Sequence, residues 1–270
     1  MDQADNTLID HIITDVIAPV MSSIQFNLRS LTALSPGLEN QDDWANWCHN
    51  GYQWPTDSGM PPTSAIPAMM RRRMSNISKL AVQIAAQLTQ HDSVNFAVFS
   101  SRHGELQRTI TLLTDILAGE EASPTAFSQS VHNTAAGLFT IATKQAVPAT
   151  SLSGGEDSFH YALTEAAIYL AENPTHKVLI IDFDAPLPAP YTPFEIHHLP
   201  PYALGMVVEQ GEQITVSRKS MPEDRSEAAL PQALAFYAKC LNLEPEFSIQ
   251  SARQRWQWKI KRTQNVAIAE

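Results

Sequence analysis

Ala149-Thr-Ser-Leu-Ser-Gly-Gly-Glu-Asp-Ser-Phe159 is the most informative stretch of the chain, because it predicts a short strand, a turn of small residues and the start of a helix. Such a turn lies at the positive end of a helix dipole, where an anion or a nucleophile is stabilised. Ser153 and Glu156 have the spacing of a capping box, in which a serine side chain accepts from a free helix amide. We therefore expect Ser153 to cap the helix rather than to act as a nucleophile.

Strands and helices alternate on both sides of this turn. The expected strands are residues 23–28, 94–101, 146–152, 177–182, 203–209 and 213–218, the last two forming a hairpin through Gln210-Gly211-Glu212. The expected helices are residues 68–90, 105–118, 129–144, 157–172 and 228–241. This alternation predicts an α/β fold in which a mixed, largely buried β-sheet is flanked by helices.

Four stretches, in this order, resemble the β-ketoacyl synthases, the condensing enzymes of fatty-acid and polyketide assembly. They are Ile66-Pro-Ala-Met-Met-Arg-Arg-Arg-Met74, Ser100-Ser-Arg-His-Gly-Glu-Leu106, Ser123-Pro-Thr-Ala-Phe-Ser-Gln-Ser-Val-His-Asn133 and the turn at 150–158. The resemblance spans about residues 23–210. It looks closest to the chain-length-factor-like members of bacterial aryl-polyene and type II polyketide systems, which keep the N-terminal half of the fold. It implies a thiolase-like half-fold that lacks the C-terminal repeat.

The nucleophile of the resembling family is missing. Its active members carry a cysteine at the tip of the turn, and this position falls on Leu152, which cannot form a thioester. The resemblance also implies two histidines in a C-terminal half, whereas residues 211–270 contain no histidine. We therefore expect no catalytic residue, no cofactor and a role as a partner subunit.

The resemblance implies a heterodimer with a complete ketosynthase, together with an acyl carrier protein that delivers the substrate. The subunit would shape the partner's acyl or polyene tunnel with side chains of the helix after the first core strand and of the segment that follows. The tunnel and interface candidates are Leu106, Ile110, Leu113, Phe127, His132, Asn133 and Phe139. Ordinary core packing is the alternative role for each apolar member.

Two basic stretches oppose the formal net charge of −10. One is the run Arg71–Arg73. In the other, at residues 255–262, Trp256, Trp258 and Ile260 alternate with cations, which predicts a half-buried edge strand with a basic outer face. That face either protects the edge from aggregation or docks an acidic carrier protein. The docking candidates are Arg255, Lys259 and Lys261.

Several classes of function are disfavoured by composition and spacing. The acidic net charge argues against nucleic-acid binding. Two distant cysteines give neither a disulfide framework nor zinc spacing, so we expect a cytoplasmic protein without a metal site. No apolar run reaches the roughly 20 residues of a membrane span. Five of the nine histidines invite a metal assignment, but they lack chelating spacing; they are His103, His132, His160, His197 and His198.

Residues 1–22 are expected to form a helical extension, residues 23–218 the ketosynthase-like half, and residues 219–270 a C-terminal helix and basic edge strand. Asp182 and Asp184 favour a turn at a strand end over acid–base chemistry. An alternative function is a stand-alone acyl-thioester hydrolase that uses Ser151, Ser153 or Asp157. That alternative requires a base beside the serine.

Overall fold

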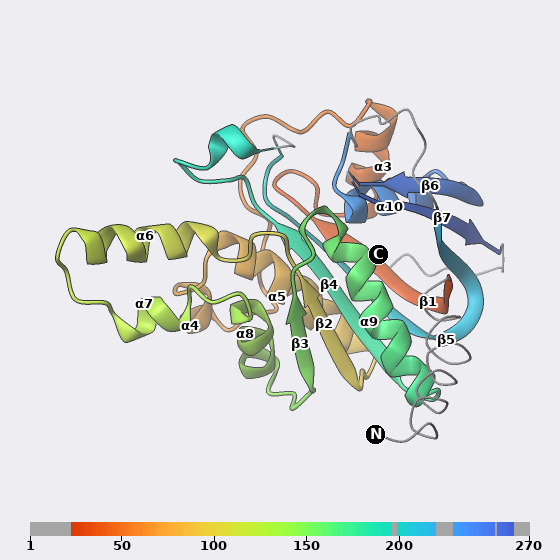
Figure 1. The fold of residues 1–270 in the computed structure, drawn as a ribbon, viewed down its shortest axis with the longest axis horizontal. Helices are drawn as coiled ribbons and strands as arrows, with labels where there is room; N and C mark the ends of the chain where they lie inside the picture. Colours follow the sequence, from red (N-terminus) through yellow and green to blue (C-terminus); the bar gives the residue numbers. More distant parts are fainter. Residues whose placement is uncertain (1–22, 196–198, 220–228, 252, 262–270) are drawn as a thin grey trace, which may run out of the picture.

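A computed structural model describes residues 23–195, 199–219, 229–251 and 253–261 (Figure 1). The expected N-terminal helix at 1–22 lies outside the described residues, as do His197 and His198. The strands are β1 Ser23–Leu34, β2 Phe96–Ser100, β3 Ala149–Leu152, β4 Lys177–Asp184, β5 Tyr202–Lys219, β6 Glu246–Gln250 and β7 Arg255–Ile260. The helices are α3 Gln41–His49, α4 Ala68–Arg71, α5 Asn76–His91, α6 Leu106–Leu117, α7 Pro124–Ser128, α8 Thr134–Thr143, α9 Ser158–Glu172 and α10 Gln232–Leu241.

The described strands form one mixed sheet in the order β3-β2-β4-β5-β7-β6, with β1 also paired to β5. Strand β2 is parallel to β3 and β4, whereas β5 is antiparallel to β1, β4 and β7. Short apolar strands that alternate with helices bury both of their faces in this way. The predicted mixed α/β sheet is confirmed.

Helices cover both faces of the sheet (Figure 1). Val98 and Ile180 point to the face covered by α9, α3 and α10, while Phe99 and Ile181 point to the face covered by α5 and α8. Successive strand residues face opposite sides, so these adjacent pairs supply both cores. Helix α5 lies within its core, with 11 of its 16 residues buried.

The predicted hairpin around Gln210-Gly211-Glu212 is wrong, because β5 continues through it as a single strand. The register with β1 shifts between Phe26, which faces Ile214, and Asn27, which faces Glu209. The Asn27 side-chain oxygen accepts from the amide of Gln213 at 3.1 Å. A Cβ at position 211 would lie 2.0 Å from that oxygen, so glycine permits the bulge.

Two helix predictions and one strand prediction also need correction. The expected helix at 68–90 is interrupted, because Ser75 accepts from the amide of Ser78 at 3.1 Å and caps a new helix, α5. The expected helix at 129–144 starts only at Thr134. Strand β7 is not an edge strand, since β6 pairs with the side that β5 leaves open.

Helices α6 and α7 form an arm, defined here as residues 106–128. In Figure 1 the arm extends to the left of the sheet, beyond the edge strand β3. Leu112 is the buried residue of α6, so apolar packing contributes little to holding the arm on the body. The arm therefore depends on contacts at its base.

Candidate functional site

Leu152, the expected nucleophile position, ends the edge strand β3 directly before the turn. Gly154 and Gly155 then lead through a 3₁₀ turn at Gly155–Asp157 into α9. The strand-turn-helix prediction is confirmed, but the capping box is wrong. Ser153 donates to the carbonyl of Arg102 at 3.0 Å, and the amide of Gly154 donates instead to Ser158 at 3.0 Å.

The serines of the turn do not form a nucleophile–base pair within the described part of the chain. Ser151 Oγ is buried without a hydrogen-bond partner there, and Ser153 is engaged with a backbone carbonyl. A serine nucleophile needs a base within hydrogen-bond reach. The geometry therefore gives no support to the alternative of a serine hydrolase.

Asp157, the third candidate for that alternative, is a buried hydrogen-bond acceptor. Its carboxylate accepts from Gln232 at 2.8 Å, Ser251 at 2.9 Å and Trp256 at 3.3 Å. Three donors from the C-terminal part of the chain offset the cost of burying this carboxylate. Asp157 thus fastens α10 and β7 to the start of α9.

His160 belongs to the same network. Trp258 donates to its Nε2 at 3.1 Å, its Nδ1 lies 2.5 Å from the side-chain oxygen of Gln232, and its ring stacks on Trp256 at 4.5 Å. Burial lowers the pKa of His160 to about 3, so the ring is neutral at physiological pH. With both nitrogens engaged, His160 is unavailable as a base.

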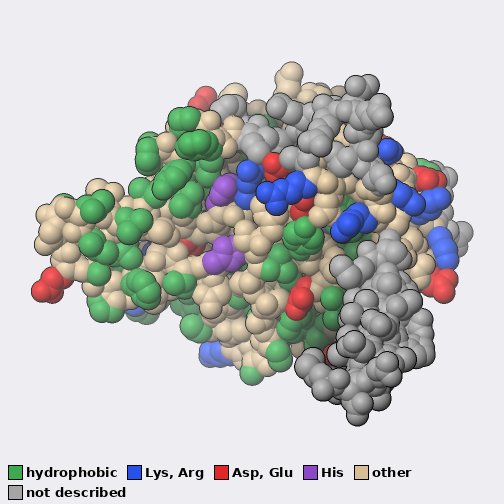
Figure 2. Space-filling model, viewed as in Figure 1, with side chains coloured by type: hydrophobic (Ala, Val, Ile, Leu, Met, Phe, Trp, Pro, Cys, Tyr) green, Lys and Arg blue, Asp and Glu red, His purple; other side chains and the backbone are tan. Residues whose placement is uncertain are grey.

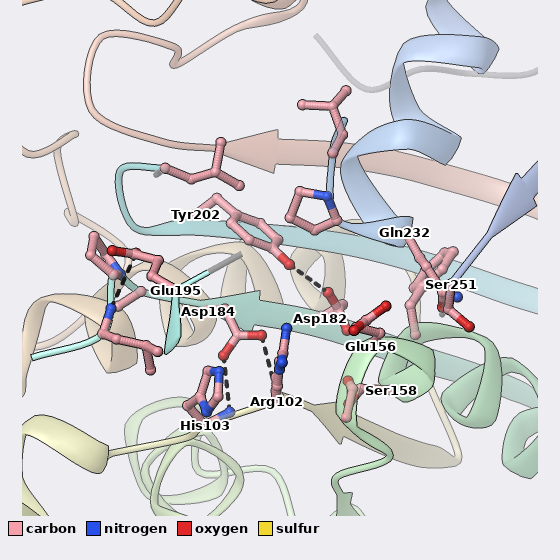
Figure 3. A pocket seen from close by; sticks show the side chains of 18 of the residues that line it. Arg102, His103, Glu156, Ser158, Asp182, Asp184, Glu195, Tyr202, Gln232 and Ser251 are labelled. Carbon is pink, nitrogen blue, oxygen red and sulfur yellow. Dashed lines mark hydrogen bonds between the residues drawn. The ribbon is translucent and has the colours of Figure 1, made fainter. Parts of the chain in front are cut away.

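A small cavity of about 80 Å³ opens at the ends of β2 and β4, beside the start of α9. In Figure 3, Tyr202 and Asp182 face one another from neighbouring strands. Asp182 accepts from Ser100 at 2.7 Å and from Tyr202 at 3.1 Å. Burial, and secondarily the nearby Asp184, raise the pKa of Asp182 to about 7.

Asp184 holds the turn that follows β2. Its carboxylate accepts from Ser101 at 2.9 Å and from the amides of Arg102 and His103 at 2.9 and 3.1 Å (Figure 3). The expectation of a turn-forming role fits Asp184. It does not fit Asp182, which lies inside β4 because this strand runs on to Asp184.

The arm carries the exposed tunnel candidates. Leu113 is 51% exposed and Phe127 60%, with Leu117 at 87% beside them, and Figure 2 shows hydrophobic side chains along the arm at the left. Leu106 and Ile110 are half-buried at its base. Solvent-facing apolar side chains grouped on one element mark an interaction surface.

The candidates after the arm have different surroundings. His132 lies with its Nε2 3.0 Å from the carbonyl of Ser101, so it connects the segment before α8 to the turn after β2. Asn133 is exposed. Phe139 is fully buried against Phe99, with ring centroids 5.8 Å apart, and is a core residue rather than a surface one.

The basic face of β7 is largely neutralised. Lys259 lies 3.3 Å from Glu246 and Lys261 lies 3.0 Å from Glu212, while Arg255 donates to Ser248. Arg72 and Arg73 are exposed, and Arg71 donates to the carbonyl of Thr63. No described acidic side chain forms an ion pair with these three arginines.

Sequence reasoning missed two parts of the site. Strand β6 was not predicted, although its alternating Phe247 and Ile249 gave a short signal. The buried network of Asp157, Gln232 and His160 had no sequence signal, because its members are up to 99 positions from their partners. Among the described residues, no helix is long and apolar enough to cross a membrane, and no cluster has the composition of a metal site.

The family model of the β-ketoacyl synthase N-terminal domain matches residues 44–259, so the chain belongs to this family. The Xenorhabdus doucetiae structure of the ketosynthase ApeO in complex with its chain length factor ApeC contains a similar chain. The similarity has a TM-score of 0.79 and 31% identity over 87% of this chain and 99% of that chain. The predicted thiolase-like half-fold is therefore confirmed.

Two more distant structures show the same fold. One is the ishigamide ketosynthase/chain length factor, with a TM-score of 0.58 and 15% identity over 75% of this chain and 68% of that chain. The other is a β-ketoacyl synthase from Burkholderia phymatum STM815, with a TM-score of 0.52 and 13% identity over 83% and 70%. No curated protein matches the sequence.

Proposed function

We propose that this chain is a non-catalytic, chain-length-factor-like subunit that pairs with a ketosynthase in the cytoplasm and shapes its acyl or polyene tunnel. The observation that carries the proposal is the similarity, over nearly the whole of a matched chain, to a structure that contains a ketosynthase and its chain length factor. Leucine at position 152 agrees with it, because the partner must then supply the thiol. Aryl-polyene or related polyketide assembly is the system that we favour.

The surface that would receive the partner is the edge strand β3 together with the arm. Among the described strands β3 pairs only with β2, which leaves the other row of its backbone donors and acceptors open to a strand of another chain. Ile141 on α8 is 64% exposed and is a further large apolar side chain in solvent. Backbone pairing and apolar contact are the two components that such an association requires.

Within that surface, the side chains that would set product length are the exposed ones. Leu113 and Phe127 are large, apolar and solvent-facing in this chain. Leu106 and Ile110 are half-buried at the base of the arm and would form the tunnel wall behind them. Phe139 has no exposed ring surface in this chain, so we do not assign it a role in the tunnel.

We propose that an acidic carrier protein docks at the Arg71–Arg73 turn rather than on β7. Lys79 adds a fourth cation beside a groove that Arg71 and Arg72 line. Lys259 on β7 and Lys261 directly after it already have acidic partners, so they offer less uncompensated charge. The arginine turn is thus the stronger electrostatic target on an otherwise acidic protein.

Co-expression with a candidate ketosynthase, followed by sizing and native mass spectrometry, tests the pairing. We expect a complex with one copy of each chain that survives dilution to micromolar concentration. A stable monomer that binds no ketosynthase would overturn the proposal.

A further inference from the structure

The base of the arm contains a buried carboxylate. Glu105, directly before α6, is 4% exposed, and its Oε1 accepts from Ser75 and Ser78 at 2.5 Å each. Its Oε2 lies 3.5 Å from Nε of Arg108. A buried carboxylate is tolerated only with such partners, so the start of α6 is fixed to the start of α5.

Arg108 extends this connection to two further segments. Its Nη2 donates to the carbonyl of Arg73 at 2.7 Å, and its Nη1 donates to the side-chain oxygen of Gln129, just after α7. One guanidinium therefore joins the turn before α5, the first turn of α6 and the end of α7. The planar fork of a guanidinium fixes these directions relative to one another, which a lysine cannot do.

We infer that Arg108 and Glu105 are positioning residues that set the angle at which the arm leaves the body of the protein. Apolar packing does little to set this angle, because Leu112 is the buried residue of α6. Thr109 gives local support by donating to the carbonyl of Ser130 at 3.0 Å. The consequence for product length rests on the proposed function. If the arm enters the partner's tunnel, its angle places Leu113 and Phe127 there, and Arg108 then helps to determine product length.

Hydrogen exchange and product analysis of the complex with its ketosynthase test this inference. Arg108→Met keeps the aliphatic stem and removes the whole fork, and Gln129→Leu removes only the contact with the end of α7. Arg29→Met is the matched control, because Arg29 forms an exposed ion pair with Glu209 away from the arm. Arg108→Lys restores the charge without the fork.

We expect Arg108→Met to speed exchange at residues 106–128 at least tenfold while α9 exchanges as in the wild type. Gln129→Leu and Arg108→Lys should give smaller increases, and Arg29→Met none. The mean product length should shift by at least one extension unit in Arg108→Met at unchanged complex stoichiometry. A purely structural role would lower the yield without shifting the length.

Wild-type exchange of the arm in both Arg108→Met and Gln129→Leu would overturn the inference. Faster exchange with an unchanged product distribution would overturn its link to product length. If the wild-type chain binds no ketosynthase, the proposed function fails by itself. Exchange measured on the chain alone then still decides whether Arg108 positions the arm.

Discussion

The C-terminal segment and the arm differ in how far they bury their large apolar side chains. The segment from α10 to β7 buries Trp256 and Trp258 and gives the hydrogen-bonding groups of Asp157 and His160 partners inside the chain. The arm instead leaves large apolar side chains in solvent, with Phe127 among them. The chain thus completes its own core at one end and presents an exposed apolar surface at the other, as a partner subunit would.

The largest expected effect lies in the C-terminal network. Asp157→Ala leaves the buried donors of Gln232, Ser251 and Trp256 without their acceptor. We expect a loss of about 3 kcal/mol in the free energy of unfolding, since each stranded donor keeps its desolvation cost. Urea denaturation measures it.

Asp42→Ala, at an exposed position in the first turn of α3, is the control and should cost less than about 0.5 kcal/mol. A loss in Asp157→Ala no larger than in this control would mean that the network does not fasten the C-terminal segment.

The next effect concerns the arm. The double variant Leu113→Asp and Phe127→Asp places charges on the apolar surface, so ketosynthase affinity should fall roughly 30-fold, or about 2 kcal/mol. The free energy of unfolding of the isolated chain should stay within about 0.5 kcal/mol of the wild type, since both side chains are exposed. Titration of the two subunits measures the affinity.

Leu243→Asp is an exposed control outside the arm. Equal weakening by the control, or unchanged affinity in the arm variant, would remove the arm from the interface.

Hydrogen bonds offset only part of the cost of burying the Asp182 carboxylate. Its pKa is raised from 3.8 to about 7, so its contribution to stability declines as the pH rises from 4 to 7. His160 has the opposite sign: its pKa is lowered from 6.5 to about 3, so stability falls as the pH drops below 6.5. Between pH 4 and 6.5 the two slopes oppose one another in the wild type.

Asp182→Asn should remove the first slope and leave stability rising with pH up to about 6.5. At pH 8 the variant should be more stable than the wild type by about 1 kcal/mol, because the buried negative charge is gone. Chemical denaturation across this pH range measures both slopes. Parallel pH profiles for variant and wild type would show that Asp182 does not titrate with a raised pKa.

The smallest expected effect separates the two basic surfaces. Reversing Arg72 and Arg73 to Glu should weaken carrier-protein binding about threefold at low salt, whereas Lys259→Glu should change it by less than twofold. Fluorescence anisotropy of a labelled carrier protein reads both. A larger loss of affinity with Lys259→Glu than with the Arg72 and Arg73 reversals would place the docking surface on β7.

The strongly periodic parts of the fold could be predicted from the sequence. The apolar run at Val178–Ile181 and the helix after the turn at 150–158 carry their own signals. The hairpin prediction at Gln210-Gly211-Glu212 was wrong. A glycine in this context signals a turn, but β1 pairs with β5 on both sides of it. Phe127 and Phe139 look alike in the sequence, yet one is exposed and the other fully buried. Arg108 gave no signal, since its acceptors on Arg73 and Gln129 are 35 and 21 positions away.

The most direct measurement of the central claim is the mass spectrum of the products made by the ketosynthase complex with variants of Leu113. We predict shorter products with Leu113→Trp and longer products with Leu113→Ala, at similar rates of condensation, because in the proposed function the partner performs the chemistry and this chain sets the available length. An identical product distribution in both variants and the wild type, from intact complexes, would contradict it.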